Sequence, residues 1–231
     1  MINHRNLYLL FALYLPFISI PAQADELAVD KVYHPYVHLE REIEWRMTSA
    51  DGEQKHQLAL GKSFSDQLFL ELYLIGEKGN GEDFEVSNYE FEAKWQLTEQ
   101  GEYDIDWGVI TEFEGSRHED SWEFSTALLM EKEFNRWIGT LNLWGIYEWG
   151  DDVETELESS LTAQIRYRYS RLFEPALEFY SGPDTRALGP VIMGDLRLGT
   201  RRKLHWETGV IFGLDSKTPN NTFRLLTEFE F

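Results

Sequence analysis

The final nine residues of the chain, Phe223 to Phe231, place the strongest constraint on its fold. Side chains of a β-strand point alternately to its two faces, and these two faces differ. One face carries Phe223, Leu225, Thr227, Phe229 and Phe231, and the other carries Arg224, Leu226, Glu228 and Glu230. A row of aromatic and aliphatic side chains on one face is typical of a strand that meets lipid. The pattern therefore predicts a membrane-facing terminal strand.

The N-terminal residues have the pattern of a secretory signal peptide. A short polar stretch with Arg5 is followed by an apolar run, Leu7 to Ile20, and by the small residues Ala22 and Ala24 around Gln23. The apolar run is shorter than the roughly 20 residues of a spanning helix. We therefore expect export and cleavage after Ala24, followed by a flexible periplasmic segment over residues 25–35.

Composition excludes several classes of protein. The chain has no cysteine, so it forms neither disulfides nor thiolate metal sites. Its formal charge of −20 disfavours nucleic acid as a partner, because phosphate binding needs clustered lysines and arginines. No later apolar run approaches the length of a spanning helix. If the chain crosses a membrane, it must do so as a closed barrel, which satisfies every backbone polar group.

From Tyr36 onward the chain divides into segments of two-residue periodicity separated by turn residues. The expected strands are Tyr36–Met47, His56–Phe64, Gln67–Glu77, Phe84–Leu97, Tyr103–Glu114, Ser121–Glu133, Arg136–Trp149, Glu156–Ser170, Pro175–Ser181, Val191–Thr200, Leu204–Leu214 and Thr222–Phe231. Most are close to the length of about nine to eleven residues that a tilted strand needs to cross a bilayer. The sequence predicts an all-β fold: a single antiparallel up-and-down transmembrane β-barrel over residues 36–231, with twelve strands, or ten as the alternative.

The connections give a second indication of this topology. Odd-numbered connections are expected to be long and extracellular, and even-numbered ones to be short periplasmic turns, with both termini in the periplasm. Outward aromatics are expected to form a girdle at each end, with Trp122 and Trp149 in one and Trp137 and Phe231 in the other. Periodicity alone leaves a soluble barrel with its faces inverted as an alternative.

In a membrane barrel the polar faces of the strands line the lumen. The residues expected there are Glu40, Glu42, Glu44, Glu71, Glu90, Glu92, Lys94, Asp106, Glu112, Glu123, Arg166, Arg168, Glu178, Asp195, Arg197, Glu207, Arg224 and Glu228. We expect Arg224 and Arg197 to pair with Glu40, Glu42 or Glu44 near the seam that closes the barrel. A lumen of this charge either plugs and rigidifies the barrel through paired charges or forms a narrow channel that favours small neutral or cationic solutes.

No motif in the sequence indicates catalysis or a cofactor. Gly-x-Ser-x-Gly and His-Glu-x-x-His are both absent, and the run His118, Glu119 and Asp120 is interpreted as a solvated loop. No loop has the Asp-x-Asp-x-Asp-Gly spacing of a dedicated calcium site. An enzyme that modifies lipid or the envelope is the alternative function.

The terminal strand, in particular Phe223, Leu225, Phe229 and Phe231, resembles the C-terminal sorting strand of Gram-negative outer-membrane β-barrels. With its strand pattern, the chain is similar to small, uncharacterised proteobacterial members of that class. The resemblance implies a place in the outer membrane, assembly by the outer-membrane barrel machinery, and contact with lipid and lipopolysaccharide. It implies no substrate.

Overall fold

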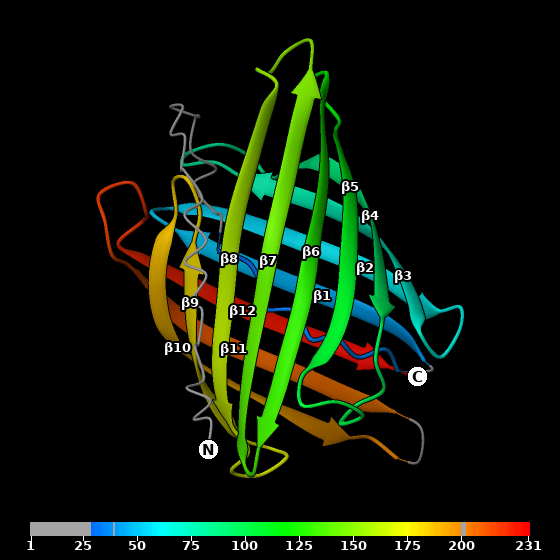
Figure 1. Ribbon diagram of the computed structural model, residues 1–231. Coiled ribbons are helices and arrows are strands. Elements are labelled where there is room, and N and C mark those ends of the chain that lie inside the picture. The colour runs from blue at the N-terminus through cyan, green and yellow to red at the C-terminus, as the bar shows by residue number, and fades with distance from the viewer. Residues whose placement is uncertain (1–28, 39, 200–201) are drawn as a thin grey trace, which may run out of the picture.

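The computed structural model describes residues 29–38, 40–199 and 202–231. Twelve antiparallel strands form a closed barrel in which each strand pairs with its neighbours in sequence, and the last strand pairs with the first (Figure 1). The strands are β1 (Arg41–Ala50), β2 (Glu53–Ser63), β3 (Leu68–Lys78), β4 (Glu85–Gln96), β5 (Asp106–Ser116), β6 (Ser121–Phe134), β7 (Trp137–Gly150), β8 (Glu156–Tyr167), β9 (Glu174–Ser181), β10 (Arg186–Arg197), β11 (Lys203–Gly213) and β12 (Asn221–Glu230). The predicted signal peptide, residues 1–24, lies outside the described residues. Within the described ranges no helix has the length and apolarity needed to cross a membrane.

The prediction of twelve strands is confirmed, and the first strand differs from its expected bounds. It begins at Arg41 instead of Tyr36. It turns into β2 through Asp51 and Gly52, whose φ angles are 49° and 95°. Two consecutive residues with positive φ match the right-handed twist of the flanking strands, which explains why an Asp-Gly pair closes this hairpin.

The expected alternation of long and short connections is wrong. We call the end where β1 begins and β12 ends the terminal end, and the opposite end the far end. The first far-end connection is only residues 51–52, whereas the longest connection, residues 97–105, lies at the terminal end. The alternation failed because glycine and serine residues that were expected in loops belong to strands: Gly115 and Ser116 lie in β5, and Gly150 lies in β7.

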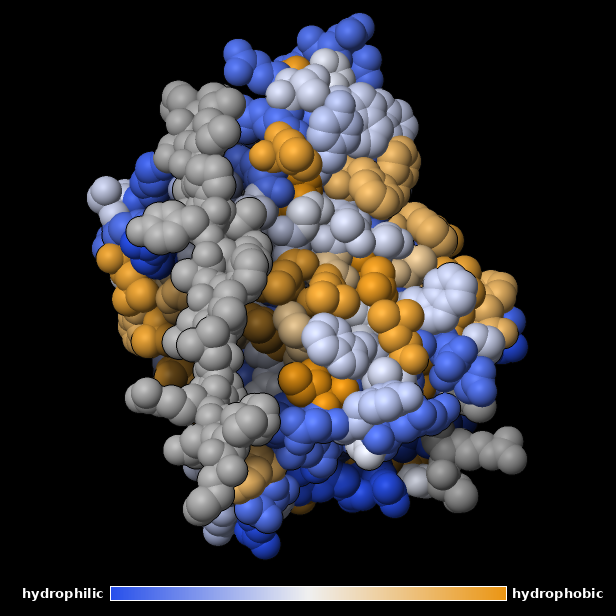
Figure 2. Space-filling view, viewed as in Figure 1, coloured by the Kyte–Doolittle hydropathy of each residue, from blue (hydrophilic) through white to orange (hydrophobic). Residues whose placement is uncertain are grey.

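The outward faces form an apolar belt. Leu60 and Leu72 are 63% and 64% exposed, and the outward positions of the other strands carry similar side chains. Figure 2 shows this belt across the middle of the molecule, with hydrophilic residues above and below it. Outward aromatics pair near both ends, for example Tyr147 with Trp149 at 5.3 Å and Phe229 with Phe231 at 5.8 Å between ring centroids. Exposed apolar surface of this extent marks a surface that meets lipid or a partner.

The inward faces are polar at many positions but apolar at others. Ile110, Ala127 and Leu129 are buried on neighbouring strands and pack with Tyr33, which precedes the barrel in sequence. Such packing requires part of the chain to lie inside the barrel. We call residues 29–38 the inner segment.

Candidate functional site

The inner segment runs through the lumen. Its chain joins β1 at the terminal end, where the backbone N–H of Glu40 donates to Ser63 Oγ at 3.2 Å. From there it extends toward the far end without forming a strand, and Val29, Val32 and Tyr33 are 3–5% exposed. The structure therefore differs from the expected flexible segment over residues 25–35, of which residues 29–35 are described and packed inside. Burial of these apolar side chains against inward apolar wall residues explains the difference.

Amide side chains of the wall hold the backbone of the inner segment. The backbone N–H of Tyr33 donates to Asn142 Oδ1, and Asn142 Nδ2 donates to the carbonyl oxygen of Tyr33, both at 2.9 Å. Nearer the terminal end, the backbone N–H of Val37 donates to Gln96 Oε1 at 2.8 Å. Asn142 and Gln96 are both buried. They supply the partners that a backbone without a neighbouring strand needs.

Ion pairs fix the same segment by its charges. Lys31 Nζ lies 2.6 Å from Glu44 Oε2, and Arg46 pairs with Glu44 at 2.7 Å and with Asp30. Burial alone would raise the pKa of Asp30, but the Arg46 guanidinium and the nearby Lys55 and Lys31 hold that pKa below its usual value. Burial alone would lower the pKa of Lys31, but the Glu44 carboxylate raises it above its usual range. These charges are therefore kept ionised by one another.

Arg224 is the centre of a second buried network. Its side chain is fully buried, and its guanidinium donates to Glu178 Oε1 and Glu207 Oε2, both at 2.9 Å, to Tyr180 Oη at 2.6 Å and to the carbonyl oxygen of Asp30 at 2.5 Å. This network joins β9, β11 and β12 to the inner segment.

The expected pairing of Arg224 and Arg197 with Glu40, Glu42 or Glu44 is wrong. Glu44 is already occupied by Lys31 and Arg46. The Arg224 guanidinium reaches away from β1, toward Glu207 on β11 and Glu178 on β9. Arg197 lies exposed at the terminal end of β10, opposite Lys203 in the strand register.

Acidic residues form a continuous row at the far end. The row crosses five neighbouring strands, and each member stands directly opposite the next: Glu90, Glu114, Glu123, Glu148 and Glu156. Like charges in direct opposition destabilise a sheet. A row of this kind therefore indicates that its negative charge serves a purpose other than the stability of the sheet.

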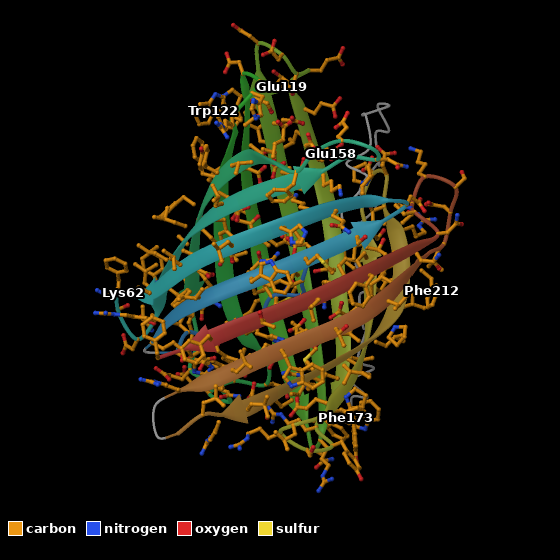
Figure 3. The ribbon with its side chains drawn as sticks, turned by 180° about the vertical axis from the view of Figure 1, so that it is seen from behind. Lys62, Glu119, Trp122, Glu158, Phe173 and Phe212 are labelled. Atoms are coloured by element: carbon orange, nitrogen blue, oxygen red, sulfur yellow. The ribbon has the colours of Figure 1, made fainter. Side chains whose placement is uncertain are left out.

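This row lines a cavity of about 310 Å³ between the inner segment and the far end. The lining contains nine carboxylates and two lysines, Lys31 and Lys55. Glu158 lies at the mouth of the cavity, whereas Glu119 lies at the tip of the tall β5–β6 hairpin, away from it (Figure 3). The cavity attracts cations and repels anions.

Seventeen of the eighteen predicted lumen residues are buried or partly buried, and Arg197 is exposed. The buried ones are Glu42, Glu44, Glu71, Glu90, Glu92, Asp106, Glu178, Glu207 and Arg224. Those that are partly buried are Glu40, Lys94, Glu112, Glu123, Arg166, Arg168, Asp195 and Glu228. In the predicted sorting strand, Phe223, Leu225, Phe229 and Phe231 lie on the opposite, outward face.

Sequence reasoning missed Tyr33, Asn142 and Trp144. Tyr33 and Trp144 pack edge to face with ring centroids 5.6 Å apart inside the barrel. The available signal was the apolar residues at inward positions, such as Ile110 and Leu129, which a water-filled lumen does not require.

Lumen histidines pair with carboxylates. His34 Nδ1 lies 2.5 Å from Glu131 Oε2, and His205 lies 2.7 Å from Asp195 and 3.1 Å from Glu207. His34 belongs to the inner segment and His205 to β11, and among the described residues no serine takes part in these pairs.

Neither a known protein family model nor a curated protein sequence matches this chain. Solved structures do match its fold. The KdgM porin, solved in complex with disordered oligogalacturonate, has a TM-score of 0.57 and 13% identity, over 82% of this chain and 99% of that one. The COG4313 outer membrane channel from Pseudomonas putida F1 also has a TM-score of 0.57 and 13% identity, over 87% and 98%. The NanC porin has a TM-score of 0.54 and 8% identity, over 83% and 100%. This chain therefore has the fold of Gram-negative outer-membrane β-barrels.

Proposed function

We propose that this protein is a narrow passive channel of the outer membrane that favours small cationic or neutral solutes. The acidic cavity at the far end carries the proposal. Nine carboxylates and only two lysines line this cavity, so a solute that enters it is surrounded by negative charge. The porin and channel neighbours support it through their shared fold. The inner segment narrows the lumen below the cavity, so the solute must be small.

The proposal places the far end outside the cell. Both chain ends of an even-stranded barrel lie on the same side, and in outer-membrane barrels that side is the periplasm. The aromatic terminal strand supports assembly by the outer-membrane barrel machinery, and the apolar belt supports contact with lipid and lipopolysaccharide. Export follows from the predicted signal peptide.

The negative charge of the cavity distinguishes this proposed channel from a channel that passes acidic sugars. Oligogalacturonate, named with the KdgM structure, carries a carboxylate on each sugar. The cavity of this chain opposes such a solute by Coulomb repulsion. We therefore expect cations and neutral molecules to pass in preference to anionic oligosaccharides.

Conductance in planar bilayers under a salt gradient tests the function. The expected result is a small current whose reversal potential shows cation preference. Replacing Glu123 and Glu148 together with glutamine should reduce that preference, whereas Glu119→Gln, which also removes a far-end charge but lies away from the cavity, should not. Anion preference would overturn the proposal. Absence of current, even after removal of residues 25–38, would favour a structural barrel.

A further inference from the structure

Three carboxylates converge inside the lumen. Glu90 and Glu92 lie on β4 and Glu112 on β5, and each offers an oxygen within 4.8 Å of the others. The strand register brings them together, since Glu92 stands directly opposite Glu112, and Glu90 follows on the same face of β4. Like charges in this arrangement repel one another and need a positive counter-charge.

Glu92 shows most directly that a counter-charge belongs here. The residue is 0% exposed, and neither of its carboxylate oxygens has a hydrogen-bond partner within the described part of the chain. Glu71, opposite Glu92 on β3, accepts a hydrogen bond from Tyr73 through Oε2, at 3.2 Å, but its Oε1 is likewise unpartnered. An ionised carboxylate taken out of water needs a partner to be stable. Glu92 therefore points to a bound positive ion.

The other group of lumen acids with similar spacing does not need an ion. Glu42, Glu44 and Glu228 also bring three oxygens within 4.8 Å of one another. However, Glu44 already receives Lys31 at 2.6 Å and Arg46 at 2.7 Å. The chain supplies the counter-charge at that group itself.

We propose that Glu90, Glu92 and Glu112 form a binding site for a hard divalent cation of the size of Ca²⁺. Ca²⁺ takes carboxylate oxygens at about 2.3–2.6 Å, so two of its ligands stand up to about 5 Å apart, which accommodates the observed spacing. Its flexible coordination lets water complete the shell. The ion enters from the acidic cavity, whose lining includes Glu90 and Glu112.

The site goes beyond the proposed channel and does not depend on it. Binding is measured on purified protein without any current, so the two proposals fail separately. A barrel that conducts but binds no ion refutes only the site. A barrel that binds the ion but passes no current refutes only the channel.

Terbium luminescence tests the site in the full-length protein, purified in detergent after treatment with EDTA. Tb³⁺ is a stand-in for Ca²⁺ that emits when a nearby aromatic ring absorbs ultraviolet light. Tyr33 and Trp144 line the same cavity as Glu90 and Glu112 and supply that ring. We expect a saturable signal that Ca²⁺ displaces.

The decisive comparison is between two glutamine variants. Glu92→Gln should weaken Tb³⁺ binding about tenfold or more, a change of about 1.4 kcal/mol or more in binding free energy. Glu119→Gln, the matched control at the tip of the β5–β6 hairpin and away from the cavity, should leave the affinity unchanged. Equal affinity in the wild type and Glu92→Gln would overturn the proposal, as would a signal that Ca²⁺ fails to displace.

Heat stability provides a second readout, which also checks that the variants fold. Ca²⁺ should raise the unfolding temperature of the wild type but not that of Glu92→Gln. In EDTA the variant should be at least as stable as the wild type, because glutamine removes an unpaired buried charge. If Ca²⁺ stabilises both proteins equally, the ion binds elsewhere and the proposed site is refuted.

Discussion

Arg224→Met tests whether the buried charge network holds the barrel and its inner segment together. The substitution keeps an unbranched side chain but removes the guanidinium, which donates to Glu178, Glu207, Tyr180 and the backbone of Asp30. Removing one partner of a buried ion pair costs about 3–5 kcal/mol, and here the Glu178 carboxylate would lose the guanidinium that pairs with it. We expect a loss of that size in the free energy of unfolding, measured by urea denaturation in detergent and followed by heat-modified gel mobility.

Two comparisons give this prediction its control. Arg168→Met removes an arginine whose partner, Glu133, is one-third exposed, and exposed pairs contribute about 0–1 kcal/mol. Combining Arg224→Met with glutamine at both Glu178 and Glu207 should recover much of the lost stability, because no unpaired charge remains. If Arg224→Met unfolds at the same urea concentration as the wild type, the network does not stabilise the fold and the reasoning is wrong.

Three further predictions address the inner segment and the terminal strand. Asn142→Leu removes both hydrogen bonds to the Tyr33 backbone, which together contribute about 2 kcal/mol. The chain has no cysteine, so a Val32→Cys substitution provides a single thiol, which should react with maleimide roughly thirtyfold faster when Asn142→Leu is also present. An unchanged rate would contradict the anchoring role of Asn142. The lowered pKa of Asp30 means that its contribution is present above the ordinary aspartate pKa and lost as pH falls through the folded value. The urea concentration at which the protein unfolds should therefore fall through this group only below about pH 4. Replacing Phe231 with serine should slow assembly, and undiminished outer-membrane yield would count against the sorting-strand interpretation.

The sequence was sufficient to predict the strands because their signal is local. Two-residue periodicity and the aromatic terminal strand lie within short windows, and the twelve strands followed from them. The acidic row could not be predicted because it depends on the register between strands, and a shift of one residue exchanges the two faces. The inner segment was missed because its partners, such as Asn142 and Glu131, are about a hundred residues away in the chain. The partners of Arg224 could not be predicted from adjacency at the seam, because the guanidinium reaches β11 and β9 on the other side of β12.

The lumen divides into two halves with different ways of holding acidic residues. Around the inner segment and toward the terminal end, carboxylates pair with bases: Glu131 with His34, Glu207 with Arg224 and His205, Glu174 with Arg166, and Glu230 with Lys203. These pairs lock the wall and the inner segment together.

At the far end, neutral donors hold the acidic row instead. Glu114, Glu123 and Glu148 accept hydrogen bonds from Asn88, Ser125 and Ser121. Neutral donors orient a carboxylate without cancelling its charge, so the field of the row remains available to a solute. A barrel that served only as a rigid structure would gain stability by pairing these acids, as its other half does. The negative charge that the row retains therefore supports the proposal that the far-end cavity receives cations.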